Sequence, residues 1–357
     1  MIACLFSLSL AGVHGPAPAQ PSTPFASLLQ SPVPAPTVIR LDEAYRGFTP
    51  RSITLSPDGR WLVSTSAAEE VLVQSEGSPH LLDDRHRFNT NVAIAAGGTS
   101  LVFARLRDLH ELPLPRASAP AGELRLLGVA HEPVARVAAS SDGRFVATGG
   151  HSGTVELWAR DGEPPQRLQV PKTVTALSFS GDAGLLAVGD RSGAVTLVRL
   201  DAATLRSGPA CPPEVFARRA DCARSRLSLD SEVRALSLNG DGSILVTSDW
   251  LRGVRVWNLR ANHHRPLAMA ELPLEGASDV ALSADGTKLA LASMTCAGGS
   301  ECVEAILLWD LQHDTAHLLH RGTKPVKLPA ATKVAVSADG RVVAARLTGG
   351  EILRWRL

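Results

Sequence analysis

The segment VRALSLNGDGSILVTSD, residues 233–249, contains the pattern that decides the fold. Apolar residues recur in short runs on either side of Asp241-Gly242, which indicates two strands joined by a tight turn. Asp-Gly suits such a turn because its backbone needs a positive φ, which glycine adopts at little cost. The segment therefore predicts a β-hairpin.

This hairpin recurs along the chain, and repetition of one unit is the signature of a repeat architecture. The copy at 92–106 is the weakest, because Gly97-Gly98 replaces Asp-Gly. The other copies lie at 53–66, 134–150, 174–190, 280–293 and 334–347. A third apolar strand follows at 154–161, 194–201, 253–260, 305–312 and 351–357, and a shorter fourth strand can be read at 166–170 and 225–229.

Four antiparallel strands per unit match one blade of a β-propeller. Seven units therefore predict an all-β, seven-bladed propeller over residues 37–357. The chain stops at Leu357 on a third strand, and the segment 37–44 can supply the missing fourth. Such a pairing closes the ring and removes exposed strand edges. A two-sheet sandwich would not explain why a tryptophan recurs at one place in the third strand, as Trp158, Trp257, Trp309 and Trp355 do.

At this point the sequence resembles the WD-repeat (WD40) propellers, through ELWA (156–159), VWNL (256–259), LWDL (308–311), RWRL (354–357) and the SPDG, SSDG and SADG turns. The Gly-His of that family survives only as Ala130-His131, and Ser152 and Ser192 stand where it usually has aspartate. The resemblance thus implies a looser, bacterial type of repeat without most of the family's His–Ser–Asp–Trp network. SPDGRWLVS also resembles TolB-type repeats.

Composition argues against two classes of partner. The chain has 36 Lys and Arg against 35 Asp and Glu, so no basic surface for nucleic acid is expected. Its apolar runs are too short for a membrane helix. We expect a monomer without a cofactor.

The N-terminus predicts export. Residues 1–19 combine an apolar run with a small-residue cleavage site near Ala19, although no Lys or Arg precedes the run. Residues 20–36 form a Pro-rich spacer that we expect to be disordered. This predicts a periplasmic or secreted protein. The alternatives are a frayed tail or a misplaced start, and hence a cytoplasmic protein.

Four cysteines remain after such cleavage. Cys296 and Cys302 are predicted in a top-face loop of blade 6, and Cys211 and Cys222 on the bottom face of blade 4. Pairs on opposite faces cannot share one zinc ion, and Cys-x5-Cys is too long for a thioredoxin-type motif. Two local disulfides or two pairs of free thiols are left, and disulfides would require an oxidising compartment.

No catalytic or metal motif accompanies these repeats. We expect a non-catalytic scaffold whose top-face loops bind a protein or peptide. Trp250 has the composition of an interface hot spot, or else it folds over its own blade. The alternative function is a lactonase-like hydrolase with a site in the central channel. The residues predicted to contact a partner are His131, His151, Asp190, Arg191, Trp250 and Arg252.

Overall fold

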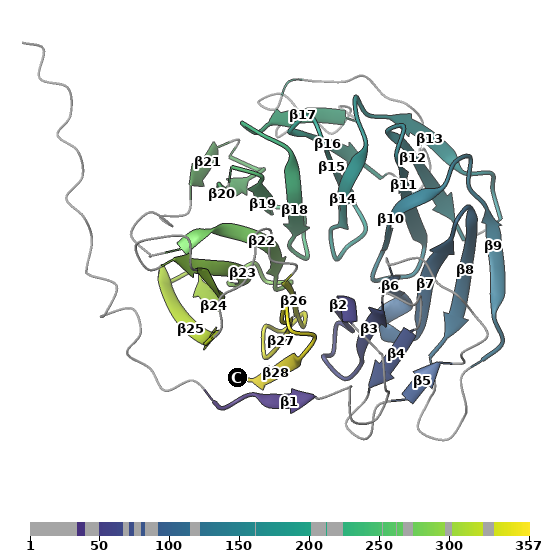
Figure 1. The fold of residues 1–357 in the computed structure, drawn as a ribbon. Coiled ribbons are helices and arrows are strands. Elements are labelled where there is room, and N and C mark those ends of the chain that lie inside the picture. The colour runs from purple at the N-terminus through teal and green to yellow at the C-terminus, as the bar shows by residue number, and fades with distance from the viewer. Residues whose placement is uncertain are drawn as a thin grey trace, which may run out of the picture.

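The computed structural model describes residues 34–39, 50–66, 71–74, 80–82, 92–114, 122–160, 162–200, 212, 224–251, 253–261, 263–266, 274–296, 302–323 and 332–357. Within these residues the strands form seven four-stranded antiparallel sheets arranged in a ring (Figure 1). The prediction of an all-β propeller is confirmed. We number the sheets as blades 1 to 7 along the chain.

Blades 1 to 6 run outward from the centre of the ring in chain order, and blade 7 does so for its first three strands (Figure 1). Blade 1 has β2 (Pro50–Leu55), β3 (Leu62–Ser66), β4 (Val71–Gln74) and β5 (His80–Leu82). Blade 2 has β6 (Val92–Ala95), β7 (Ser100–Arg105), β8 (Asp108–Pro113) and β9 (Arg125–Val129), with the 3₁₀ turn η2 (Ala96–Gly98) after β6. Blade 3 has β10 (Val134–Ala139), β11 (Phe145–Gly150), β12 (Thr154–Ala159) and β13 (Gln166–Gln169). Blade 4 has β14 (Val174–Phe179), β15 (Leu185–Asp190), β16 (Ala194–Arg199) and β17 (Arg224–Ser228).

The remaining blades follow the same order. Blade 5 has β18 (Val233–Leu238), β19 (Ile244–Asp249), β20 (Val254–Asn258) and β21 (His263–Pro266). Blade 6 has β22 (Leu274–Leu282), β23 (Lys288–Cys296), β24 (Cys302–Asp310) and β25 (Thr315–Arg321). Blade 7 has β26 (Lys333–Val336), β27 (Val342–Arg346) and β28 (Ile352–Arg356), and β1 (Thr37–Ile39) pairs with β28 as its outermost strand.

The turn between the first and second strands of a blade repeats one hydrogen-bond pattern. In blade 3 the Ser140 hydroxyl donates to Asp142 at 2.7 Å and accepts from the Phe145 amide at 2.9 Å. Gly143 takes a φ of 74°, as the Asp-Gly pattern requires. We call the end of the ring that carries these turns the bottom face. The same pattern recurs as Ser56–Asp58, Ser180–Asp182, Asn239–Asp241, Ser283–Asp285 and Ser337–Asp339.

Backbone hydrogen bonds also join these turns from blade to blade. The Gly240 amide donates to Ala284 at 2.7 Å, the Ala284 amide to Ala338 at 2.9 Å, and the Ala338 amide to Pro57 at 2.8 Å. Backbone hydrogen bonds thus connect blades 5, 6, 7 and 1 at the bottom face. Small residues are needed there, because a Cβ on Gly240 would lie 2.7 Å from the Ala284 oxygen.

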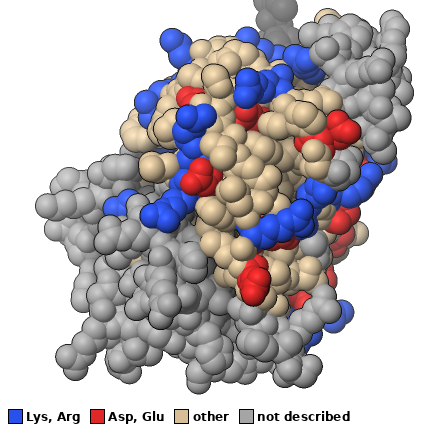
Figure 2. Space-filling model, turned by 90° about the vertical axis from the view of Figure 1, so that its right-hand side faces the viewer, with Lys and Arg blue, Asp and Glu red and all other residues tan. Residues whose placement is uncertain are grey.

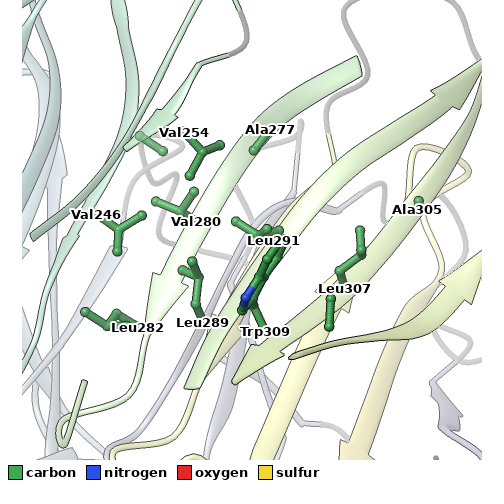
Figure 3. Close-up of a cluster of buried hydrophobic side chains, with 12 residues drawn as sticks. Val246, Val254, Ala277, Val280, Leu282, Leu289, Leu291, Ala305, Leu307 and Trp309 are labelled. Atoms are coloured by element: carbon green, nitrogen blue, oxygen red, sulfur yellow. The ribbon is translucent and has the colours of Figure 1, made fainter. Parts of the chain in front are cut away.

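The recurring tryptophans fill the spaces between blades. Trp309 is 4% exposed and packs in a cluster that contains Val246 and Val254 of blade 5 and Leu289 of its own blade (Figure 3). Trp158, Trp257 and Trp355 are buried in the equivalent positions. Their predicted role in blade packing is confirmed.

Candidate functional site

The top face of the ring carries the loops between second and third strands and the loops that lead to the next blade. On blades 3 to 5 these loops form one connected layer. The His151 oxygen accepts the Thr173 hydroxyl at 2.8 Å, and the Thr173 oxygen accepts the Arg191 amide at 3.0 Å. The Arg191 guanidinium pairs with the Glu232 carboxylate at 3.2 Å, and the backbone carbonyl of Glu232 accepts a hydrogen bond from the Trp250 amide at 2.8 Å. Three of the predicted contact residues, His151, Arg191 and Trp250, therefore lie along one chain of contacts.

Trp250 lies at the blade 5 end of this layer and is 51% exposed. The adjacent Leu251 is 68% exposed, and its amide donates to the Ser231 hydroxyl at 2.9 Å. The guanidinium of Arg234 lies 4.7 Å from the centre of the Trp250 ring, a cation–π arrangement. The loop thus presents two large apolar side chains on a hydrogen-bonded support.

Arg234 reaches this position through an irregularity in β18. The register with β19 shifts between Val233 and Ala235, which makes Arg234 an extra residue in its strand. Such bulges re-aim side chains. Strand alternation alone would not have identified Arg234, although the shift recurs in β2, β10 and β14.

Asp190 has a different role from the one predicted. Its side chain is 0% exposed, so it cannot offer a polar contact at the rim of an interface. Its Oδ1 accepts from the Ser192 amide at 2.7 Å, the Ser192 hydroxyl at 2.5 Å and the Ala194 amide at 3.2 Å. Asp190 therefore fixes the shape of the loop that presents Arg191.

Blade 3 builds the equivalent loop with another acid. Gly150 occupies the place of Asp190, since Gly150 pairs with Val134 as Asp190 pairs with Val174. The Glu132 carboxylate accepts from the Ser152 amide at 3.0 Å and the Thr154 amide at 3.3 Å. Partial burial would raise the pKa of Glu132, but the hydrogen bonds from Ser152 and Thr154 hold it below its ordinary value.

The two predicted histidines are both exposed on this face. The His131 amide donates to Glu156 at 2.8 Å, which anchors the loop but leaves the imidazole outside. Leu106, which the repeat pattern did not mark, is 70% exposed in the corresponding loop of blade 2 with a φ of 53°. A bulky residue with positive φ is uncommon, and here it carries an exposed apolar side chain.

The cysteines of blade 6 are in strands, not in the loop that was predicted for them. Cys296 ends β23, Cys302 begins β24, and the two are partners in the strand register. The Cys302 sulfur is in a disulfide and the residue is 4% exposed. The Cys296–Cys302 pairing itself stays a prediction. Cys211, Cys222 and Arg252 lie outside the described residues, as do the predicted signal peptide and most of the spacer.

Arg136 of β10 links blade 3 to blade 4. Its Nε donates to the Thr175 oxygen at 2.7 Å and its Nη1 to the Ala135 oxygen at 2.8 Å. Burial lowers the pKa of Arg136, while the negative charges of Asp279 and Glu232 raise it.

In the part of the chain that the structure describes, no three His, Cys, Asp or Glu side chains gather as a metal site. No described helix has the length and apolar character to cross a membrane.

Comparison with known proteins gives one family. The model described as "WD domain, G-beta repeat" matches residues 124–159 and 224–258. The first match includes the loops of His131 and His151, and the second includes Trp250 and Arg234. No curated protein matches the chain. The resemblance to TolB-type repeats stays a prediction.

Proposed function

This chain is a β-propeller that carries WD40 repeats, and we propose that it is a non-catalytic scaffold that binds a protein or peptide through the top face of blades 3 to 5. WD40 domains generally mediate protein interactions, which supports the class of function. The partner would contact the layer of loops that runs from His151 to Trp250.

The observation that carries the proposal is the exposure of Trp250 and Leu251 beside Arg234. Interface hot spots are enriched in Trp and Arg, and they are stronger where the side chains are held in place before binding. The hydrogen bonds of the Trp250 and Leu251 amides supply that support. His131, His151 and Arg191 would form the polar rim of the interface.

We also propose that the protein acts in the periplasm or outside the cell. The apolar N-terminus with its cleavage site supports this, and so does the disulfide at Cys302, because disulfides persist mainly in oxidising compartments. Sequencing the mature N-terminus from a cell-envelope fraction tests the proposal. A start at or near Gln20 is expected, whereas an intact Met1 in the cytosol contradicts export.

The scaffold proposal is tested by affinity capture from cells under matched conditions. The variant Trp250→Ala/Leu251→Ala removes the two apolar side chains, and Arg144→Ala on the bottom face is the control. We expect the double variant to reduce the yield of a reproducible partner about ten-fold or more, as the loss of a hot spot does. Equal yield from all three proteins would refute the assignment of the top face.

A further inference from the structure

A groove of about 460 Å³ opens between the outer strands of blades 3 and 4. Its walls include Leu168, Val170 and Pro171 from blade 3, and Thr196, Arg224 and Arg226 from blade 4. In Figure 1 this is where β13 and β17 neighbour each other on the rim of the ring. The groove is separate from the Trp250 loop of blade 5.

The groove lies beside a position where blade 4 lacks the tryptophan that blades 3, 5, 6 and 7 carry. Strand register gives the equivalence: Val198 pairs with Leu186 as Trp158 pairs with Val146 and Trp257 with Leu245. Each tryptophan packs against the preceding blade, as Trp257 does with Leu227 of blade 4. At Val198 a much smaller side chain faces blade 3.

The hydrogen-bond acceptor of the tryptophan is lost along with it. The indole N–H groups of Trp158 and Trp257 donate to Thr148 at 3.1 Å and Thr247 at 2.9 Å. In blade 4 that threonine position is Val188, which pairs with Thr196 as Thr148 pairs with Glu156. A Trp–Thr pair has thus become a Val–Val pair.

On the blade 3 side of the groove, no larger side chain replaces the missing indole. Leu168 occupies on β13 the place that Leu227 occupies on β17, since they pair with Val155 and Val195 respectively. Between blades 4 and 5 the leucine and Trp257 are both present. Between blades 3 and 4 only the leucine is, so the space stays open.

The blade 4 wall carries two arginines on the same side of β17. Arg224 pairs with Val198 and Arg226 with Thr196, and cross-strand partners share a face of a sheet. Within the residues that the structure describes, neither guanidinium makes a hydrogen bond or an ion pair. Figure 2, which views the ring from the side of β9 and β13, shows that both Lys and Arg and Asp and Glu surround uncharged surface on this side of the molecule. The wall is therefore suited to a negatively charged partner.

On each wall of the groove the side chains that line it recur every two residues, which is the period of an extended chain. Leu168 and Val170 are two residues apart on one wall, and Arg224 and Arg226 are two residues apart on the other. An extended peptide directs alternate side chains to opposite sides. We propose that the groove binds an extended segment of a partner protein in which acidic and aliphatic residues alternate. The acidic side chains face the arginines and the aliphatic ones face Leu168 and Val170.

The probe is a fluorescein-labelled peptide of three Glu-Leu repeats, followed by fluorescence anisotropy on the whole protein. The control peptide has Gln in place of each Glu. We expect saturable binding of the acidic peptide that weakens as salt is raised, and Arg224→Gln/Arg226→Gln should weaken it about ten-fold. Wild-type protein that binds both peptides equally, or an arginine double variant with full affinity, would overturn the proposal.

The repeat itself provides a variant that fills the groove. Val188→Thr/Val198→Trp restores the pair found in blades 3 and 5, and we expect it to fold and to bind the acidic peptide no better than the control peptide. A folded filled variant with wild-type affinity would contradict the proposal, and if it fails to fold, the arginine variant decides. Trp250→Ala should leave peptide binding unchanged, so this test is independent of the top-face proposal.

Discussion

The guanidinium carbon of Arg234 lies 4.7 Å from the centre of the Trp250 ring, so a residue of the innermost strand of blade 5 supports an exposed aromatic side chain on the loop above it. A cation–π contact at such a site contributes about 0.5–1 kcal/mol. The contact restricts the indole before a partner arrives, which reduces the entropy lost on binding.

Because Arg234 supports Trp250, we expect variants of the two residues to weaken binding of the captured partner by different amounts. Arg234→Ala should weaken binding about three- to five-fold, less than the loss caused by Trp250→Ala, while Arg234→Lys should keep part of the affinity. Titration of each purified variant with the partner measures this order. If Arg234→Ala weakens binding more than Trp250→Ala does, Arg234 contacts the partner directly.

Asp190 is predicted to matter for stability. Its Oδ1 is the acceptor for the amides of Ser192 and Ala194, and the residue is fully buried. Asp190→Ala leaves these donors without their acceptor, which should lower the free energy of unfolding by about 2–3 kcal/mol. Urea denaturation measures the change, with the exposed turn residue Asp58→Ala as a milder comparison. A change below about 0.5 kcal/mol would show that water replaces the carboxylate.

Glu132 in blade 3 and Asp190 in blade 4 accept hydrogen bonds from equivalent loop amides, and a double-mutant cycle tests whether the two carboxylates have the same role. A Cβ on Gly150 would run into the Glu132 carboxylate, so Gly150→Asp alone should destabilise the protein by about 1–3 kcal/mol. Combined with Glu132→Ala, the new aspartate can take the amides of Ser152 and Thr154 as Asp190 does in blade 4. The double variant should therefore be more stable than Gly150→Asp. Simple additivity in thermal or urea unfolding would refute the equivalence of the two acids.

The contacts of Asp310 predict how the stability of the fold depends on pH. Partial burial raises its pKa, but hydrogen bonds from Lys288 at 2.6 Å and from His313 hold the pKa well below the ordinary value for aspartate. A lowered pKa in the folded state stabilises the fold above about pH 4, and this contribution is lost as pH falls toward the folded-state pKa.

The variant Asp310→Asn isolates this effect. At pH 7 it should be less stable than wild type by about 1–2 kcal/mol, and the difference should shrink as pH falls below about 4. Urea midpoints between pH 2.5 and 7 measure it. A difference that stays constant over that range would mean that the carboxylate is not ionised in the way the contacts require.

The ring could be predicted from sequence because strand alternation and Asp-Gly turns are local signals. Each Asp-Gly turn fixes where a hairpin reverses, and the tryptophans at 158, 257, 309 and 355 fix the third strand. The segment 37–44 was expected to supply the fourth strand that the last blade lacks, and within it β1 pairs with β28. These inferences needed only backbone geometry and periodicity.

The site was harder to predict because it depends on where individual side chains point. Asp190 was placed by its loop position, yet the amides of its own loop turn it inward. Arg234 depends on a strand bulge, which alternation does not show. The groove did leave a signal, since Val188 and Val198 interrupt the Thr and Trp positions of the repeat, but its arginine wall becomes visible only when β13 and β17 are placed side by side.

The most direct test of the central claim is site-specific photo-crosslinking in the native cell. A photoreactive phenylalanine analogue replaces Trp250 on the top face in one protein and Arg144 on the bottom face in the other. The side chain of Arg144 is 51% exposed, so the two positions are comparable in access. We expect a discrete crosslinked protein from position 250 and none from position 144. The same products from both positions, or products from position 144 alone, would contradict a partner-binding top face.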